Sequence, residues 1–272
     1  MHDDLVLERP DWAIDPAEAA GRAAAFVADT VAAAGAEGLV VGLSGGIDSA
    51  VSAALAVKAL GPGRVHGIRL PYRTSSPASL ADAQAVADTL GLAAETVEIT
   101  PVVDAFLALR PDADPVRRGN VMARVRMITL YDASQARRAL VLGTGNRTEW
   151  LLGYTTLHGD AACGLNPVAQ LYKTEVRLLA DHLGLPREVL TKAPSADLWE
   201  GQADEDELGF TYAEADRLLH HLVDEGLEPR QLAALGFAPA LVEKVAARMR
   251  SQHFKRALPP VCGFGRPSPD AA

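Results

Sequence analysis

The chain has 272 residues, of which 49% are hydrophobic and 22% charged, a composition typical of a globular protein that buries one large core. A net charge of -9 and a pI near 5.3 argue against a nucleic-acid partner, because such proteins normally carry a basic face. The acidic start does not resemble a signal peptide and no apolar run approaches membrane length, so we expect a cytoplasmic protein with no membrane partner. The two cysteines, Cys163 and Cys262, form no metal-ligand spacing and no disulfide framework.

Helical and strand-like patterns alternate along the first half of the chain. The first helix, over 16–34, is alanine-rich and amphipathic, and we expect Phe26, Val27 and Val31 on its inner side. Further patterns predict strands over 39–43, 65–70, 95–99 and 139–143 and helices over 49–56, 76–91 and 115–138. This alternation predicts an α/β fold, a doubly wound parallel sheet flanked by helices, with its ligand crevice at the carboxyl ends of the strands.

The rest of the chain is expected to be helical from Gly201 to about His253. No repeat or linker divides the sequence, so we predict a single domain over 1–272, with mobile ends at 1–15 and 259–272.

The most informative stretch is 39–50, where a strand, a Ser-Gly-Gly turn and a helix follow one another directly. The first amides of a helix have no partner inside it, and the helix dipole adds positive potential, so this geometry favours a bound anion. Gly45 and Gly46 permit close approach of a phosphate, and Ser44 and Ser49 add hydroxyl donors. The alternative is a tight turn with no ligand.

Asp48 is the unexpected member of this loop. A carboxylate beside a phosphate repels it unless a divalent cation lies between them, so we interpret Asp48 as a magnesium ligand. With an aspartate and a second serine at these positions behind a buried strand, we favour the phosphate-binding interpretation.

A second group of polar residues follows the last predicted strand. Thr144 lies at its end, and Glu149 lies about one turn into the next helix, where its carboxylate could complete a magnesium site with Asp48. The alternative is a solvated glutamate at a helix start. Lys173 opens another helix and either pairs with a phosphate or is an ordinary surface lysine. The acidic segment 194–209 has no helical or strand period and is either a lid or an exposed connector.

Residues 44–49, Ser-Gly-Gly-Ile-Asp-Ser, resemble the pyrophosphate-binding loop of the ATP pyrophosphatases. No Walker Gly-Lys-Ser/Thr is present, so the resemblance implies cleavage of ATP to AMP and pyrophosphate. Over about Ala17 to Pro260 the chain is similar to the ammonia-dependent NAD synthetases, through residues 42–49, 69–72, 119–127, 143–149, 171–174 and 194–209.

This resemblance implies an adenine nucleotide alpha hydrolase-like fold, a homodimer with the arginine-bearing helix 115–138 in its interface, and free ammonia as the nitrogen source, since no glutaminase domain precedes the matched region. It implies that Asp48 and Glu149 bind Mg²⁺, and that Asn120, Arg124, Asp160 and Lys255 meet the acid substrate. The ATP site that it implies consists of Gly42, Leu43, Ser44, Gly45, Gly46, Ile47, Asp48, Ser49, Arg69, Thr144, Lys173 and Ser195.

The departures from the family pattern all lie on the acid-substrate side. The family's Gly-Asp-Gly-Gly-x-Asp loop is 159–164 here, and its second aspartate is replaced by Gly164. Leu157 stands where the family often has a lysine, Thr155 and His158 replace aromatic residues, and Phe254 replaces or precedes part of a His-Lys-Arg run. Loss of a charge-assisted contact costs about 1.5–3 kcal/mol, enough to change a substrate preference.

The expected reaction is therefore ATP-dependent amidation of a carboxylate through an acyl-adenylate, with deamido-NAD favoured as the acid. Asp48, Lys173 and Asp160 are the catalytic candidates, Asp160 for positioning or deprotonating ammonium, with loop capping as its alternative role. The alternatives are a paralogue that amidates another acid, a sulfur-transfer enzyme that uses Cys163, and a non-catalytic adenine-nucleotide sensor.

Overall fold

Four parallel strands form the centre of the protein in the computed structural model, which describes residues 7–195, 199 and 201–262. The strands are β1 (Gly38–Gly42), β2 (Val65–Arg69), β3 (Ala93–Thr96) and β4 (Ala139–Val141), in the spatial order β3-β2-β1-β4. Leu39 of β1 is in register with Val65 on one side and Leu140 on the other. The chain thus builds the sheet outward from β1 to β3 and then returns to place β4 on the other side of β1, which puts the topological switch point between β1 and β4.

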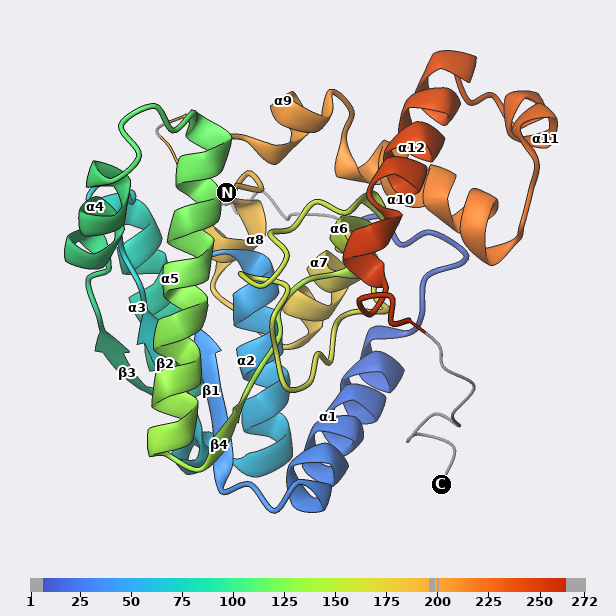
Figure 1. Ribbon diagram of the computed structural model, residues 1–272. Helices are drawn as coiled ribbons and strands as arrows, with labels where there is room; N and C mark the ends of the chain where they lie inside the picture. The colour runs from blue at the N-terminus through green and yellow to red at the C-terminus, as the bar shows by residue number, and fades with distance from the viewer. Residues whose placement is uncertain (1–6, 196–198, 200, 263–272) are drawn as a thin grey trace, which may run out of the picture.

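Helices cover both faces of this sheet (Figure 1). On one face α1 (Pro16–Ala33), α2 (Ile47–Leu60) and α7 (Lys173–His182) contact one another, and α3 (Pro77–Leu90) and α8 (Arg187–Thr191) pack beside α2. On the other face lie α4 (Thr100–Ala108) and the long α5 (Pro115–Ala136), which crosses β1 and β4. The expected doubly wound parallel sheet is confirmed.

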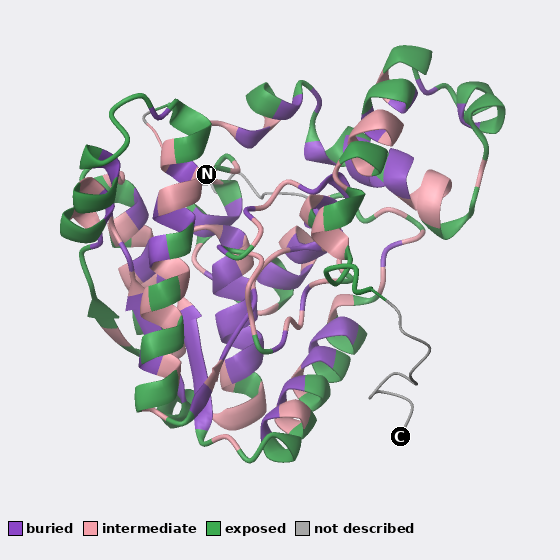
Figure 2. Cartoon of the chain, in the orientation of Figure 1, coloured by how far each residue is buried: buried purple, intermediate pink, exposed green. Residues whose placement is uncertain are grey.

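The apolar pattern of β1 explains why both faces are covered. Side chains alternate along a strand, so Leu39 and Val41 join the core beneath α1 and α2, whereas Val40 joins the core beneath α5. All three are fully buried, and Figure 2 shows β1 as the buried centre of the molecule.

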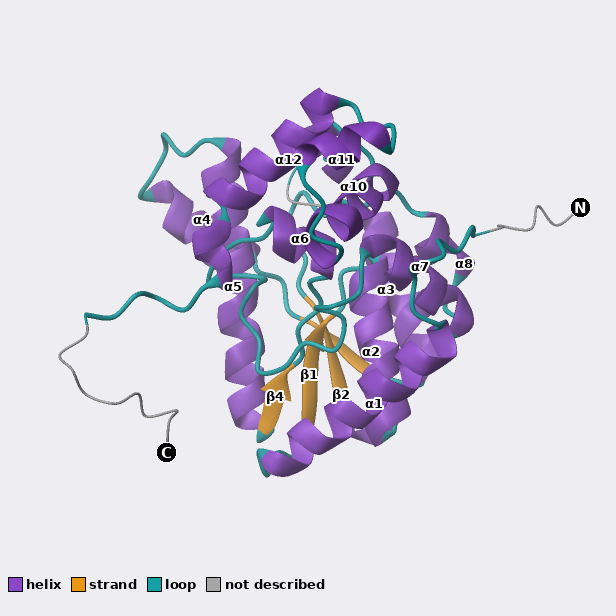
Figure 3. Ribbon diagram, turned by 90° about the vertical axis from the view of Figure 1, so that its right-hand side faces the viewer, coloured by secondary structure: helices purple, strands orange, loops and turns teal. Residues whose placement is uncertain are grey.

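The chain after 201 forms a small helical layer above the carboxyl ends of the strands (Figure 3). A separate core holds this layer together and ties it to α6 (Arg147–Leu152) through Leu152, Leu218, Leu232 and Val245. The layer consists of α9 (Asp204–Leu208), α10 (Tyr212–Leu219), the π-helical turn η2 (His220–Asp224), α11 (Pro229–Ala234), α12 (Pro239–Ser251) and the 3₁₀ turn η3 (His253–Arg256). Another 3₁₀ turn, η1 (Pro62–Arg64), leads into β2.

Several local expectations need correction. Phe26 is 45% exposed, because the buried stripe of α1 follows Ala19, Ala23, Val27 and Val31, one position away. β3 begins two residues earlier than predicted and ends at Thr96, although backbone pairing with the chain after β2 continues as far as Ile99. β4 ends at Val141 rather than at 143.

Other differences concern helices. No helix is predicted over 100–108, yet α4 forms there with Pro101 in its first turn. The predicted helical stretch 201–253 is divided into short helices by Gly209, Gly226 and Gly236, which all have positive φ.

The two ends of the chain are described in part. Residues 1–6 and 263–272 lie outside the described residues, so their expected mobility stays a prediction. Within 7–15, the Trp12 ring stacks on His220 and meets Tyr172 edge-on, and Ala13 is buried. No helix of the described part of the chain is long and apolar enough to cross a membrane.

Candidate active site

A cavity of about 660 Å³ opens at the carboxyl ends of β1, β2 and β4, beside the switch point of the sheet. Its floor is the loop after β1, and its walls come from α5, from the segments after β4 and from residues 192–195. Of the predicted site residues, the cavity is lined by Gly42, Leu43, Ser44, Gly46, Ile47, Asp48, Ser49, Asn120, Thr144, Glu149, Asp160, Lys173, Ser195 and Lys255. Residues expected from distant parts of the sequence thus meet in one place.

The loop between β1 and α2 is held in a conformation that only glycine allows at one position. Gly45 has φ +75°, and a Cβ there would lie 2.2 Å from the carbonyl oxygen of Ser79. The Ser44 hydroxyl accepts a hydrogen bond from the Gly46 amide at 3.1 Å, and the Ser49 hydroxyl donates to the Gly46 carbonyl at 2.9 Å. Gly46 is the N-cap of the 14-residue helix α2, and no side chain caps the first amides of that helix. The start of α2 lines the cavity, where these amides can bind an anion.

Asp48, Glu149 and Lys173 form a compact charged cluster at this wall. The Lys173 ammonium pairs with the Asp48 carboxylate and lies 3.8 Å from Glu149 Oε1. Asn146 caps α6 and joins the two acids, since its Nδ2 donates to Asp48 at 2.9 Å while its backbone amide donates to Glu149 at 3.0 Å. The Lys173 side chain is only 3% exposed, so it is a buried ion-pair partner rather than a surface lysine.

The cluster holds more carboxyl groups than cations, and its acids are largely buried. Burial, and then the charge of Asp48, raise the pKa of Glu149 to about 8. Burial lowers the pKa of Lys173, but Asp48 and Glu149 outweigh this effect and the net pKa is raised. A buried Asp204 adds a further carboxyl nearby, and its pKa is also raised by burial. Two carboxylates that share one ammonium are an oxygen donor set that fits a hard divalent cation such as Mg²⁺.

A buried polar network fixes the starts of α6 and α7 under this cluster. The Thr148 hydroxyl donates to the Asp216 carboxylate and accepts from the Lys173 amide at 3.1 Å. The Thr174 amide donates to the other Asp216 oxygen at 2.8 Å. Asp216 is fully buried on α10, and burial raises its pKa to about 6.

Our sequence reasoning missed Asn146 and Asp216. The first had a readable signal, because Asn-x-x-Glu at 146–149 is a capping box. For Asp216, the only signal was an aspartate among the apolar positions of a helix, and the partners of its carboxylate became visible only in the tertiary structure.

The opposite wall carries the residues expected to meet the acid substrate. Asp160 is exposed, and its carboxylate accepts hydrogen bonds from the Thr155 hydroxyl and, at 2.9 Å, from the Thr156 amide. The Asn120 amide oxygen accepts from the Thr156 hydroxyl at 2.8 Å. The Lys255 ammonium donates to the carbonyls of Gly153 and Thr155, and partial burial lowers its pKa.

Three residues expected near the ligands point elsewhere. The Arg69 guanidinium donates to Gln84 Oε1 at 2.5 Å, and the Arg124 guanidinium donates to the Leu157 carbonyl at 3.2 Å; neither lines the cavity. Gly45 forms the turn of the loop after β1 but does not line the cavity. Gly164, at the position of the lost aspartate, lies against β4, where a Cβ would be 3.2 Å from Leu140 Cβ.

Two further cavity residues carried no recognised sequence signal. Lys192 reaches back to the phosphate loop, donating to Asp82 at 2.7 Å, to the Ser79 hydroxyl at 3.0 Å and to the Gly45 carbonyl at 3.4 Å. Tyr154 donates to Glu207 at 2.8 Å and connects the loop after α6 to α9. α9 itself corrects the expectation that 194–209 has no regular structure, while 196–198 and 200 lie outside the described residues and a lid there stays a prediction.

Comparisons with known proteins agree with this architecture. The chain is 51% identical, over 86% of its length and 86% of the relative's, to an NH(3)-dependent NAD(+) synthetase of Trichlorobacter lovleyi, and 48% identical, over 90% and 88%, to one of Chlorobaculum parvum. Its structure is similar to an NMN synthetase of Francisella tularensis, with a TM-score of 0.83 and 36% identity over 92% of this chain and 100% of that one. An NH3-dependent NAD synthetase of Campylobacter jejuni, in complex with nitrate ion, gives a TM-score of 0.79 and 32% identity over the same shares. The model of the NAD synthase family matches residues 20–259, and the chain therefore belongs to the NAD synthase family.

Proposed function

We propose that this protein amidates deamido-NAD with free ammonia and ATP, through an acyl-adenylate, to give NAD, AMP and pyrophosphate. One observation carries the proposal: the phosphate loop and the Asp48–Glu149–Lys173 cluster open into the same cavity as Asn120 and Asp160. The curated relatives that are about half identical to this chain are named NH(3)-dependent NAD(+) synthetases, which supports ammonia as the nitrogen source.

In the first step a carboxylate oxygen attacks the α-phosphorus of ATP, and the bond to the bridging oxygen of pyrophosphate breaks. The loop of Ser44–Ser49 and the start of α2 would hold the departing pyrophosphate, with their amides and hydroxyls directed at its charge. Asp48 and Glu149 would hold Mg²⁺, which supplies charge neutralisation on the phosphates when bound. Lys173 would lose part of its pairing with Asp48 to that ion and be free to contact a phosphate oxygen.

In the second step ammonia attacks the activated carbonyl and AMP leaves with the pair of electrons of its bond to the acyl group. Ammonium itself has no lone pair, so a group must hold it and take its proton. Asp160 is our candidate, because its exposed carboxylate lines the cavity and is oriented by Thr155 and Thr156.

A second candidate acid is nicotinate mononucleotide. The similarity to a structure described as an NMN synthetase favours it, as do the departures at Leu157, Gly164 and Phe254 on the acid side. The rest of the reaction would be unchanged, because the ATP half of the cavity does not depend on the second nucleotide of the acid.

A pyrophosphate-release assay with ATP, Mg²⁺ and ammonium distinguishes these acids. We expect release, with equal amounts of AMP and amide, on adding deamido-NAD, and less release with nicotinate mononucleotide or unrelated carboxylates. A kcat/KM that is higher for nicotinate mononucleotide than for deamido-NAD would show that the mononucleotide is the preferred acid. Formation of ADP and phosphate, or no turnover with any acid, would overturn the mechanism, and the latter result would favour a nucleotide sensor.

We further propose that the protein acts in the cytoplasm as a homodimer that associates through α4 and α5. These neighbouring helices expose apolar side chains that a monomer would leave in water: Val102, Phe106, Leu109, Val116 and Ile128 are each at least half exposed. Light scattering during size-exclusion chromatography should give twice the chain mass for the wild type and a smaller value for Ile128→Glu, whereas a monomeric wild type would contradict the proposal.

A further inference from the structure

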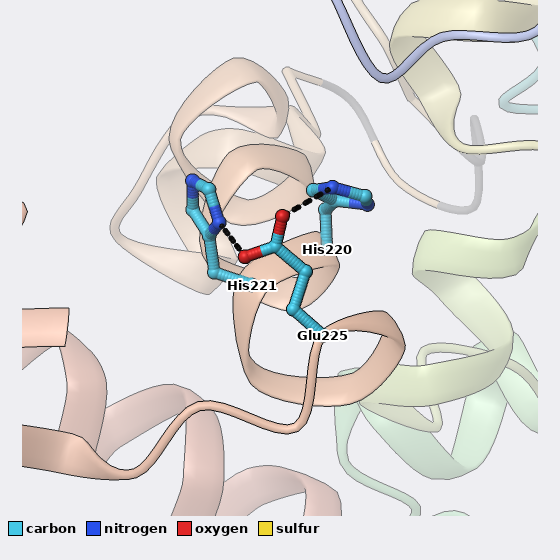
Figure 4. A group of neighbouring side chains, drawn as sticks. All are labelled: His220, His221 and Glu225. Carbon is cyan, nitrogen blue, oxygen red and sulfur yellow. Dashed lines mark hydrogen bonds and ion pairs between the residues drawn. The ribbon is translucent and has the colours of Figure 1, made fainter. Parts of the chain in front are cut away.

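A cluster of His220, His221 and Glu225 lies outside the cavity, at the junction of α10 and the loop that follows (Figure 4). Each of the three residues offers one ligand atom, and these atoms all lie within 4.8 Å of one another. His220 Nε2 is 3.4 Å from Glu225 Oε1, and His221 Nδ1 is 2.7 Å from Glu225 Oε2. Figure 4 shows the carboxylate between the two rings, which approach it from opposite sides.

The π-helical turn η2 is what brings these side chains together. In a regular α-helix, residues five apart do not face each other, whereas a π-turn places i and i+5 on the same side. The turn over His220–Asp224 therefore lets His220 reach Glu225, which His221 already faces at the ordinary i,i+4 spacing. Such single π-turns are rare and occur frequently at functional sites.

The spacing of the two rings is compatible with a shared metal ion, which would draw the three ligand atoms closer together than the 4.8 Å within which they lie. Two histidine nitrogens at about 2.0–2.1 Å from a tetrahedral ion place their ring centroids about 5 Å apart. The rings of His220 and His221 have centroids 5.4 Å apart, with an angle of 57° between their planes.

The surroundings orient the histidines as a metal site requires. His220 Nδ1 lies 3.4 Å from Asp224 Oδ2, which leaves Nε2 for an ion, and a carboxylate on the other ring nitrogen is the usual partner of a metal-bound histidine. Trp12 stacks on the His220 ring at 4.8 Å and limits its rotation. The histidine side chains are 16% and 19% exposed and that of Glu225 is 45% exposed, so an ion can enter from solvent.

We propose that His220, His221 and Glu225 form a binding site for a divalent transition-metal ion, with zinc as the best fit to two imidazoles and one carboxylate. Three protein ligands leave one position for water. This site is separate from the Asp48–Glu149 cluster, whose oxygen-only donors suit Mg²⁺ instead.

Occupancy of this site would bear on the active site through Asp224. This residue pairs with Arg147, the first residue of α6, and accepts a hydrogen bond at 2.9 Å from Tyr172, the residue that caps α7. Those two helices carry Glu149 and Lys173. An ion that fixes η2 would therefore stabilise the framework on which both active-site residues depend.

The test is a zinc titration of the chelator-treated full-length protein, by calorimetry, with excess Mg²⁺ present to fill the oxygen site. We expect one zinc ion per chain for the wild type, and an affinity more than about a hundredfold lower for His221→Gln/Glu225→Gln, because even outer-shell changes cost about 10–100-fold. The matched control is His182→Gln/Glu188→Gln, which changes the same residue types at exposed positions of α7 and α8 and should bind zinc as the wild type does.

Two further readouts separate binding from loss of structure. Circular dichroism should show both double variants folded, and the single variant Glu225→Gln, at a half-exposed side chain, replaces the double variant if the latter is unfolded. Co²⁺ should give a visible absorption band in the wild type and in the control but not in the Glu225 variant. Equal zinc stoichiometry and affinity in the wild type and the site variant, or no zinc bound by the wild type, would overturn the proposal.

Discussion

The two halves of the cavity are built differently. On the side that we propose for ATP, the side chains come from the starts of α2, α6 and α7, and Lys173, Asn146 and Asp216 are buried with their hydrogen bonds satisfied. On the acid side Asp160 is an exposed loop residue, and Lys255 belongs to a short 3₁₀ turn. Helix starts anchored to a sheet position groups accurately, whereas loops tolerate change. The departures expected from the family pattern fall on loops and on the 3₁₀ turn η3, so we expect any change in substrate preference to leave the ATP chemistry intact.

The largest effect on activity is expected from a change at Asp48, on the side of the cavity that we propose for ATP. Asp48→Asn keeps the shape and the hydrogen bond from Asn146 but removes the charge that pairs with Lys173. We expect kcat/KM to fall by about a thousandfold, or about 4 kcal/mol, as for loss of a central electrostatic contact. Pyrophosphate release measures it, and the control Asp181→Asn, at an exposed position of α7, should stay close to wild type. Normal turnover in Asp48→Asn would rule out the assigned role.

Gly45 tests whether the phosphate loop is as rigid as its packing suggests. Gly45→Ala places a Cβ 2.2 Å from the Ser79 carbonyl and requires a positive φ of a residue with a side chain. We expect the free energy of unfolding to fall by about 2–3 kcal/mol, as measured by urea denaturation. Gly63→Ala is the control, because nothing lies within 4 Å of a Cβ there. Equal stability of the two variants would mean that the loop moves easily.

A smaller effect is expected on the acid side. Asp160→Asn removes a charge but keeps the acceptor for Thr156, so the loop should retain its shape. We expect kcat/KM for ammonium to fall at least about tenfold, which corresponds to about 1.4 kcal/mol, with the KM for ATP unchanged. Steady-state kinetics with each substrate varied in turn measure both. A change confined to the KM for ATP would contradict the division of the cavity into two halves.

The pH dependence of stability tests whether the pKa of Glu149 is raised in the folded protein. The folded protein holds the pKa of Glu149 near 8, above its ordinary 4.5, so the native state keeps a proton that the unfolded chain has released. The contribution of protonated Glu149 to the free energy of unfolding is therefore fully present at low pH and is lost as the pH rises toward 8. We expect the Tm of the metal-free protein to fall as the pH rises from about 4.5 to about 8.

Calorimetry of the wild type and of Glu149→Gln tests this expectation, because the variant should lose this component of the pH dependence while the exposed control Glu98→Gln keeps it. Added Mg²⁺ should reverse the loss at high pH, since the ion binds the ionised carboxylate. A pH dependence that is the same in wild type and Glu149→Gln would show that Glu149 titrates at its ordinary value.

Local sequence determined much of this protein. The apolar run before Ser44, the Ser-Gly-Gly turn and the helix pattern after it are short-range features, and they were enough to predict the strand, the tight turn and the helix, whereas magnesium binding by Asp48 stays a prediction. Strand and helix alternation likewise predicted the parallel sheet, because parallel strands need a crossover between them. Since their positions relative to the strand ends are readable, Thr144 and Glu149 were placed on the correct edge.

Tertiary structure alone decided the rest. No local pattern shows that Lys173 is buried against Asp48, 125 residues away, or that Asp216 and Lys192 reach across to α6, α7 and the phosphate loop. Arg69 and Arg124 matched the expected positions in sequence but turn to Gln84 and Leu157, because long side chains follow whichever acceptor packing brings near. Strand order, the switch point and the charge balance of the cluster depend on contacts between distant segments, and such contacts exist only once the chain has folded.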